Sequence, residues 1–264
     1  MILLSPLDLG LAAILILMLA GLSYGMHLGI TGQILIAALR CAIQLILIGL
    51  VLKTLFENVH PGWVALIAVT MLLLASREIH ARQHHRLIGW WSLGVGALSM
   101  FISSFTVAIL TLGVIIDADP WYHPQYAIPL LGMLLGNTMN GVALGLDRLT
   151  SGTRERRQVI DARLALGQGW REAIGDTLRD SIRAGTIPIV NAMAAAGIVS
   201  LPGMMTGQIL AGSPPLEAVK YQILILFLVS AGTGFGTVAA VGLAARRLFD
   251  DRQRLRLDHL EKVG

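Results

Sequence analysis

YQILILFLVSAGTGFGTVAAVGLAA, from Tyr221 to Ala245, is the stretch that decides the fold. It holds no charged residue and exceeds the roughly 20 apolar residues that a helix needs to cross the hydrocarbon core of a bilayer. Similar runs recur from Leu7 onward; 55% of the 264 residues are hydrophobic, only 14% are charged, and the mean hydropathy is +0.71. These values lie outside the range of soluble domains. We therefore expect an all-α, polytopic bundle of transmembrane helices, forming a single membrane domain over residues 1–264.

Apolar runs between polar segments predict about seven spans. They cover residues 7–25, 32–52, 62–76, 90–116, 126–146, 186–211 and 221–245. The third run is short, about 22 Å if helical, so we expect it to extend past Pro61 or to lie tilted. No Lys or Arg precedes Arg40, so the first run lacks the basic start of a signal peptide and is expected to stay in the membrane.

The arginines predict the orientation of the spans. They gather in residues 77–86, 148–183 and 246–262, three segments that fall on one side of the membrane if there are seven spans. Loops retained in the cytoplasm carry the excess of Lys and Arg. We therefore expect the N-terminus outside, the C-terminus in the cytoplasm and a multi-pass location in the inner membrane. The net charge of +4 is explained by this asymmetry, and no nucleic-acid partner is implied.

The longest predicted loop, about residues 148–185, has the texture of two short amphipathic helices parallel to the membrane. Residues 154–166 form the first, which ends at Gly167, a residue typical of helix C-termini. The second carries an apolar stripe of i, i+4 spacing at Trp170, Ile174, Leu178 and Ile182. Periodicity alone leaves open whether the pair only anchors the loop at the membrane surface.

Within this loop Asp161-Ala162-Arg163-Leu164-Ala165-Leu166-Gly167 looks like the E-A-A-x-x-x-G element of ABC importer permeases. From Arg179 to Gln222, RDSIRAGTIPIVNAMAAAGIVSLPGMMTGQILAGSPPLEAVKYQ resembles the FetB-type permeases of the UPF0014 family, as does GMLLGN at 132–137. That family includes a bacterial iron exporter and plant aluminium-tolerance permeases. The resemblance implies an ABC exporter acting in iron homeostasis. It also implies a loop that docks on an ATPase, through Asp161, Ala162, Leu166, Gly167 and Trp170.

Polar residues inside the predicted spans are candidates for a substrate path, because an unpaired polar group is costly in hydrocarbon. Met133, Asn137 and Asn140 share one helix face at i, i+4, i+7 spacing, and Asn191 and Met193 lie in the next predicted span. Hydrogen bonding between helices explains the same residues equally well.

The sixth predicted span is interrupted by Leu201-Pro202-Gly203-Met204-Met205-Thr206-Gly207. Proline removes a backbone donor and glycine permits a break, so we expect a discontinuous helix with a gating role at Pro202, Gly203, Met204, Met205 and Gly207. A kink needed only for packing is the alternative. Methionine thioethers suit Cu(I) better than iron, so no metal site is assigned to this chain.

Motifs for catalysis are missing from the sequence. None of the three lysines follows a glycine, so the phosphate-binding loop G-x-x-x-x-G-K-[ST] cannot occur in it. It also lacks H-E-x-x-H and G-x-S-x-G, and its single cysteine, Cys41, cannot form an internal disulfide. We expect no enzyme activity and no cofactor bound by this chain, with ATP and Mg²⁺ on a separate partner chain.

These observations predict a homodimeric permease, each copy docked on one ABC ATPase through residues 154–183, that exports iron or a related metal. An ABC permease for a nucleotide sugar or another organic solute stays open. So does a self-sufficient secondary transporter, although the predicted spans hold no internal Asp or Glu for proton coupling. A membrane-organising protein without cargo is the remaining alternative.

Overall fold

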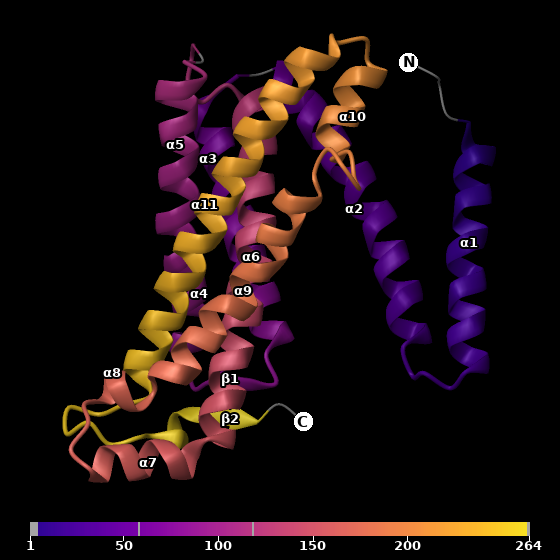
Figure 1. The fold of residues 1–264 in the computed structure, drawn as a ribbon. Helices are drawn as coiled ribbons and strands as arrows, with labels where there is room; N and C mark the ends of the chain where they lie inside the picture. The colour runs from indigo at the N-terminus through magenta and orange to yellow at the C-terminus, as the bar shows by residue number, and fades with distance from the viewer. Residues whose placement is uncertain (1–4, 58, 118, 263–264) are drawn as a thin grey trace. The chain divides into compact units, whose positions relative to one another are not determined.

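The computed structural model describes residues 5–57, 59–117 and 119–262 and is almost entirely helical (Figure 1). Within these residues, the helices long and apolar enough to cross a membrane are Leu7–Gly25, Thr31–Glu57, Pro61–Arg82, Trp90–Ile115, Pro124–Glu155 and Pro215–Arg247. The all-α polytopic bundle is therefore confirmed. The chain divides into two compact units, Met1–His60 with Leu210–Gly212, and Pro61–Ile209 with Ser213–Gly264. We call these the smaller and the larger unit.

Two apolar helices make up the smaller unit, α1 (Pro6–Gly25) and α2 (Thr31–Glu57), which pack on each other. A capping box begins α1: Asp8 N–H donates to Ser5 Oγ and Ser5 N–H donates to Asp8 Oδ2. Two backbone donors at the helix start are thereby satisfied. Both helices expose leucines such as Leu15 along their length, as expected for helices whose solvent is lipid.

The larger unit holds the remaining elements of the chain (Figure 1). Its helices are α3 (Pro61–Arg82), α4 (Trp90–Met100), α5 (Thr106–Leu110), α6 (Pro124–Glu155), α7 (Arg157–Ala165), α8 (Trp170–Ala173), α9 (Gly175–Ala195), α10 (Gly203–Leu210) and α11 (Pro215–Arg247). Two π-helical turns, η1 (Phe101–Phe105) and η2 (Thr111–Ile115), flank α5, and a 3₁₀ turn, η3 (Leu257–His259), lies near the C-terminus. Strands β1 (His85–Leu87) and β2 (Leu260–Lys262) pair antiparallel.

At the centre of the larger unit, α6 packs against α3, α9 and α11. Leu134 and Val142 on α6 and Val241 on α11 are fully buried in this core. Close approach of α6 and α9 requires glycine at both Gly141 and Gly185. A methyl group built on Gly141 would lie 2.9 Å from the Gly185 carbonyl oxygen, and one on Gly185 would overlap the Gly141 carbonyl oxygen.

Several predicted boundaries differ from the structure, and α6 also runs on to Glu155, beyond the predicted end of the fifth span at residue 146. The third span begins at Pro61 and reaches Arg82, so it is a full-length helix. The prediction ended the span before its polar last turns, but an arginine can remain in the helix while its side chain extends toward water. The second short helix of the predicted loop is divided instead between α8 and the first half of α9. α9 continues from Gly175 to Ala195 without ending at Gly185, because that glycine serves helix packing.

The predicted helix break lies several residues earlier than expected. α9 ends at Ala195, residues 196–202 are non-helical, and α10 begins at Gly203. Gly203, Met204, Met205 and Gly207 are therefore helical, which corrects their placement in the break. The physical reason is Gly197, whose φ of +80° is a conformation that glycine adopts readily. The sixth predicted span is thus two helices, and neither is among the described helices that are both long and apolar enough to cross a membrane.

The last described residues, Leu248–Lys262, form a structured segment that we call the C-terminal tail. It leaves the end of α11, and β2 within it pairs with β1, with Arg86 opposite Glu261. Ile88 N–H also donates to the His259 carbonyl oxygen over 2.9 Å. The tail therefore connects the end of α11 to the segment between α3 and α4.

Candidate functional site

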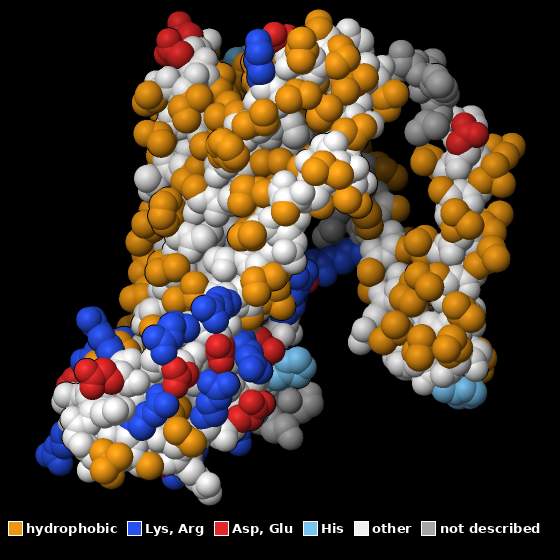
Figure 2. All heavy atoms as spheres, in the orientation of Figure 1, with side chains coloured by type: hydrophobic (Ala, Val, Ile, Leu, Met, Phe, Trp, Pro, Cys, Tyr) orange, Lys and Arg blue, Asp and Glu red, His pale blue; other side chains and the backbone are white. Residues whose placement is uncertain are grey.

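Charged side chains of the larger unit gather at the end formed by α7, α8, the start of α9 and the C-terminal tail (Figure 2). We call this the arginine-rich end. Its arginines include Arg154, Arg156, Arg157, Arg163, Arg171, Arg179, Arg246, Arg252, Arg254 and Arg256. Apolar side chains dominate the helices away from this end (Figure 2). This division matches a lipid-facing bundle with one charged, water-facing end.

α7 is fixed to the bundle from one side and exposed on the other. Ile160 is buried, and Arg163 Nη2 donates to Asp176 Oδ2 at the start of α9 over 2.8 Å. The helix ends at Ala165, just before Gly167, whose φ of +86° suits the predicted role of this glycine as a helix stop. On the outer side Leu166 is 84% exposed and Val159 is 52% exposed. The sequence therefore places apolar side chains on a surface at the charged end of the molecule.

Trp170 joins α8 to the C-terminal tail. Its backbone N–H donates to Gln253 Oε1 over 3.0 Å, and its ring lies 5.7 Å from the ring of Phe249. The guanidinium groups of Arg171 and Arg246 lie 5.4 and 5.7 Å from its ring centroid, within the range of cation–π attraction. Trp170 thus acts as an anchor between two segments far apart in the sequence.

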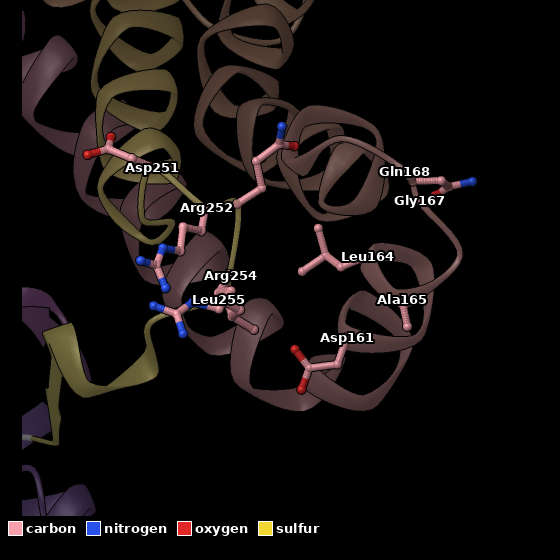
Figure 3. A pocket seen from close by; sticks show the side chains of 10 residues that line it. Asp161, Leu164, Ala165, Gly167, Gln168, Asp251, Arg252, Arg254 and Leu255 are labelled. Atoms are coloured by element: carbon pink, nitrogen blue, oxygen red, sulfur yellow. The ribbon is translucent and has the colours of Figure 1, made fainter.

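A groove lies between the end of α7 and the tail, with a volume of about 610 Å³ (Figure 3). Its α7 wall consists of Asp161, Leu164, Ala165, Gly167 and Gln168, and its tail wall of Asp251, Arg252, Gln253, Arg254 and Leu255. We call it the α7–tail groove. Of the predicted docking residues, Asp161 and Gly167 line this groove. Ala162 and Leu166 are exposed on the same segment. Trp170 does not line the groove, but its backbone N–H binds Gln253 of the tail wall.

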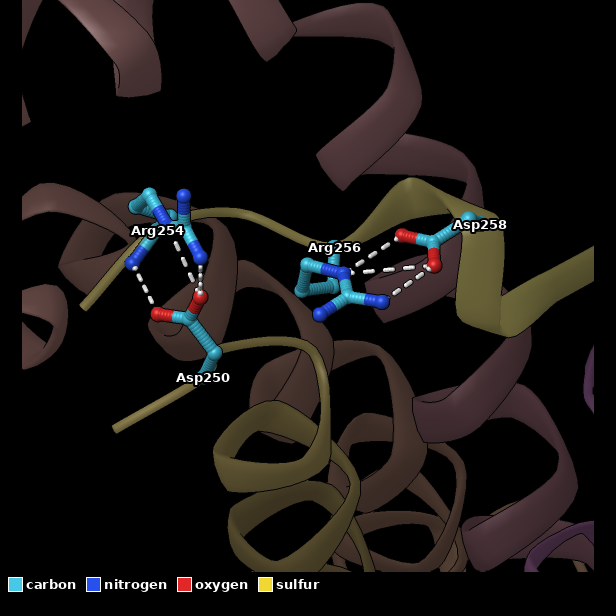
Figure 4. Close-up of polar contacts among 4 residues, drawn as sticks. All are labelled: Asp250, Arg254, Arg256 and Asp258. Carbon is cyan, nitrogen blue, oxygen red and sulfur yellow. Dashed lines mark hydrogen bonds and ion pairs between the residues drawn. The ribbon is translucent and has the colours of Figure 1, made fainter. Parts of the chain in front are cut away.

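Ion pairs within the tail hold its shape (Figure 4). Arg254 donates its backbone N–H and its Nε–H to the Asp250 carboxylate, both over 2.8 Å, and these bonds hold the pKa of Asp250 below its usual value. Arg256 Nη2 donates to Asp258 Oδ2 over 2.7 Å, and side-chain hydrogen bonding from Arg256 lowers the pKa of Asp258 to about 2. Both carboxylates are ionised at neutral pH, and the pair of Asp250 with Arg254 closes the turn that carries the tail wall.

A second, smaller cavity of about 100 Å³ lies between α6, α9 and α11, and we call it the junction cavity. Its walls are Asn137, Asn140, Gly141, Leu144, Gly185, Pro188, Ile189, Ala192 and Thr233. Asn137 Nδ2 donates to the Met133 carbonyl oxygen over 2.8 Å, and Asn140 Oδ1 accepts from Arg82 Nη1 over 2.7 Å. The structure thus brings two of the predicted path residues together in one cavity.

The other predicted path residues lie outside the junction cavity walls. Met133 and Met193 are half-buried, on α6 and α9 respectively, and Asn191 is exposed on α9. The spacing of Met133 with Asn137 and Asn140 is helical as predicted. The backbone of Met133, not its thioether, makes the contact with Asn137, so the soft sulfur has no role in this arrangement.

A family model described as "Uncharacterised protein family (UPF0014)" matches residues 6–249. The chain belongs to the UPF0014 family. A "UPF0014 membrane protein slr1647" of Synechocystis is 40% identical over 231 residues, covering 86% of this chain and 87% of that protein. The "Probable iron export permease protein FetB" of Escherichia coli is 32% identical over 256 residues, covering 97% and 96%. "Protein ALUMINUM SENSITIVE 3" of Arabidopsis thaliana is 29% identical over 230 residues, covering 87% and 81%. No solved structure matches the chain.

This UPF0014 chain is thus a multi-pass membrane protein, since its relatives are membrane proteins by name and its helices have the required length and apolarity. The α7 wall of the groove falls within the residues that the UPF0014 model matches, and most of the tail lies beyond them. Among the residues that the structure describes, no group of three or more His, Cys, Asp or Glu side chains is arranged to hold a metal ion.

Sequence patterns do not predict several residues of the candidate site in this UPF0014 chain. The tail wall, Asp251–Leu255, was interpreted only as an orientation signal, although Asp250 and Arg254 have the i, i+4 spacing of an ion pair. Thr233 was overlooked on an apolar helix. The contact of Arg82 with Asn140 joins residues 58 positions apart, and no local pattern signals such a contact.

Proposed function

We propose that this chain is the permease subunit of an ATP-driven ABC transporter in the inner membrane, and that it exports iron or a related metal species. The α7–tail groove carries the proposal, because it places the exposed side chain of Leu166 beside a charged surface at the arginine-rich end. Exposed apolar surface rimmed by polar groups marks protein–protein contacts. The resemblance of residues 161–167 to a docking element of ABC permeases names the partner as an ATPase.

ATP and Mg²⁺ bind to that separate ATPase in this proposal. The sequence of this chain has no lysine after a glycine and therefore no phosphate-binding loop. The chain is then a transport subunit and not itself an enzyme, and it binds no cofactor of its own. Its work is to change conformation when the ATPase does.

A second copy of this chain completes the permease. Asn137, Asn140 and Asn191 are exposed on α6 and α9 in the single chain. Amide side chains facing hydrocarbon are costly, and a second copy or an aqueous path between two copies relieves that cost. We therefore propose a homodimer in which these faces of α6 and α9 lie at the path between the subunits.

The metal cargo is supported by the relatives. One is named a probable iron export permease and another is named for aluminium sensitivity. A second candidate, export of a nucleotide sugar or another organic solute, is favoured by one observation: the junction cavity has no carboxylate, imidazole or thiol in its walls.

Site-directed crosslinking tests the docking proposal. Cys41 is the only cysteine, so Cys41→Ser gives a background in which Leu166→Cys carries a thiol-linked photocrosslinker. Leu216→Cys is the matched control, because Leu216 is 76% exposed at the opposite end of α11. With a purified candidate ABC ATPase from the same genome, we expect a covalent product from position 166 and none from position 216. No stable complex, or equal products from both positions, contradicts docking at the groove.

A further inference from the structure

A further pocket lies where two candidate membrane spans meet the charged end of the larger unit. The span Trp90–Ile115 begins there and the span Pro215–Arg247 ends there. The pocket has a volume of about 240 Å³, and its walls are Leu87, Ile88, Trp91, Arg247, Asp258 and His259. We call it the Trp91–Arg247 pocket. Its walls are separate from those of the α7–tail groove and from the faces of α6 and α9 proposed for the homodimer.

Backbone pairing between distant segments builds this pocket. Antiparallel β1 and β2 place Leu87 opposite Leu260, and Ile88 N–H donates to the His259 carbonyl oxygen over 2.9 Å. His259 Nδ1–H donates in turn to the Arg247 carbonyl oxygen over 3.0 Å, because a carbonyl oxygen can only accept. Hydrogen bonds therefore hold together the wall residues that come from β1, η3 and the end of α11.

The guanidinium group of Arg247 supplies the positive charge of the pocket. It lies 4.9 Å from the Trp91 ring centroid, so its face is engaged in a cation–π contact while the N–H groups on its edge remain able to donate. The preceding Arg246 pairs with Asp251, whereas Arg247 forms no ion pair with any residue that the structure describes. Its charge is therefore available to a ligand.

Asp258, the acidic residue of the walls, does not cancel this charge. Arg256 Nε donates to Asp258 Oδ1 over 2.8 Å, and Arg256 Nη2 donates to Asp258 Oδ2 over 2.7 Å (Figure 4). This pair is neutral as a whole, so the pocket keeps the positive charge of Arg247. The Trp91–Arg247 pocket therefore favours an anionic group.

Apolar and aromatic side chains border the pocket. Ile88 and Trp91 in its walls are 51% and 48% exposed, and the adjacent Trp90 is 91% exposed. Tryptophans at the ends of membrane spans lie at the level of the lipid headgroups, and basic pockets between spans bind such headgroups. A volume of about 240 Å³ is below the roughly 300–1,000 Å³ of sites that enclose a small molecule. The pocket thus fits a compact anionic group whose apolar remainder stays outside.

We propose that the Trp91–Arg247 pocket binds the phosphate group of an anionic phospholipid in the leaflet at the arginine-rich end. The edge of the Arg247 guanidinium donates to the phosphate oxygens, in the bidentate geometry that arginine offers to phosphate. The acyl chains lie along exposed apolar surface that includes Ile88. A zwitterionic headgroup is disfavoured, because its cation finds the Asp258 carboxylate already paired and the Trp91 ring already covered by Arg247. The inference depends neither on the ATPase nor on the cargo.

Native mass spectrometry of the full chain in detergent, without an ATPase, tests the proposal. Delipidated protein is titrated with phosphatidylglycerol and with phosphatidylcholine of the same acyl chains. We expect a single phosphatidylglycerol to bind each chain at least about tenfold more tightly than phosphatidylcholine, and Arg247→Gln to weaken that binding at least about tenfold, because charge-assisted hydrogen bonds are lost. Arg171→Gln should leave it unchanged. Arg171 is the matched control, since it is exposed at the same end and lies 5.4 Å from the Trp170 ring centroid.

Two further measurements complete the test. Glycerol phosphate carries the phosphate without acyl chains, and at the concentration of the lipid it is expected not to displace phosphatidylglycerol. Displacement would show that the pocket recognises a free phosphate compound and would overturn a lipid ligand. Arg247→Lys keeps the charge but lacks the planar fork, so we expect intermediate affinity, and this variant serves if the glutamine variant does not fold. Undiminished binding in either variant, or equal affinity for the two lipids, overturns the proposal.

Discussion

The backbone N–H of Trp170 donates a hydrogen bond to Gln253 Oε1, 3.0 Å away, and joins α8 to the C-terminal tail. Gln253 has a φ of +58°, a left-handed conformation that is uncommon for residues other than glycine. The contact makes one surface of two segments that are separated by the whole of α9, α10 and α11. The contact thereby ties α8 to the segment that follows α11.

Gln253→Ala removes the acceptor for Trp170 and should loosen the tail wall. A lost hydrogen bond of this kind contributes about 1 kcal/mol, so we expect several-fold faster amide exchange at Trp170 and weaker stimulation of the partner ATPase by the permease. Gln158→Ala, at an exposed position of α7, is the control. Unchanged exchange at Trp170 would show that the tail is held by its other contacts.

Gly167→Ala should disturb the end of α7. At φ +86° a Cβ atom is disfavoured by about 1–2 kcal/mol. We expect faster hydrogen exchange across residues 164–170 and reduced ATPase coupling, with the membrane-spanning helices intact by circular dichroism. Gly175→Ala at the first residue of α9, where no atom lies near a built Cβ and φ is not positive, should be tolerated. Equal effects of the two substitutions contradict this assignment.

Gly185→Ala should destabilise the junction of α6, α9 and α11. The added methyl would overlap the Gly141 carbonyl oxygen and lie 2.6 Å from Thr237 Cγ2, and overpacking of this kind costs about 1–3 kcal/mol. Thermal unfolding in detergent should show a lower midpoint than for the native chain. Gly234→Ala on α11, with no atom near its built Cβ, should leave the midpoint unchanged or raise it.

Gly197, rather than Pro202, is expected to govern the break between α9 and α10. Gly197 requires a positive φ, and the turn is closed by hydrogen bonds from Val199 and Ser200 to the Ala195 carbonyl oxygen. Gly197→Ala should therefore alter transport more than Pro202→Ala, since the proline lies just before α10 where its ring is compatible with a helix start. A larger effect of Pro202→Ala on transport in vesicles would reverse this order.

The tail should keep its structure through mildly acidic pH. Asp258 has a pKa of about 2 in the folded chain against 3.8 for the free group, because Arg256 donates to its carboxylate. Its contribution is therefore fully present above 3.8 and is lost as the pH falls through about 2. We expect amide exchange of the β2 strand, corrected for intrinsic rates, to be constant from about pH 8 to about pH 5. An increase at pH 5 contradicts the ion pair.

Local chemistry explains which parts of the fold could be predicted. Apolar runs such as Tyr221–Ala245 indicate transmembrane helices because the bilayer sets both length and composition, and Gly167 marks a helix end because of its backbone freedom. The interruption of the sixth predicted span was foreseen, but its position was wrong. Pro202 and Gly203 are as compatible with a helix start as with a break, and only the positive φ of Gly197 separates the two.

Long-range contacts explain what could not be predicted. The π-helical turn at Phe101–Phe105 places Ser103 beside Gly236 of α11, and both Thr233 and the tail wall acquire their roles only from helices packed against them. Asn137 and Asn140 were found because a polar group in an apolar run is visible in sequence. The hydrogen bond from Arg82 to Asn140 could not be predicted, because it depends on how α3 lies against α6.

ATP-dependent movement of metal in reconstituted vesicles tests the central claim most directly. Vesicles containing the chain and its candidate ATPase are loaded with ferric citrate or with a nucleotide sugar, and transport is followed with and without ATP. The account predicts ATP-dependent transport of the metal that Leu166→Glu abolishes and Leu216→Glu does not. Transport without the ATPase, or equal rates for the two variants, would contradict it.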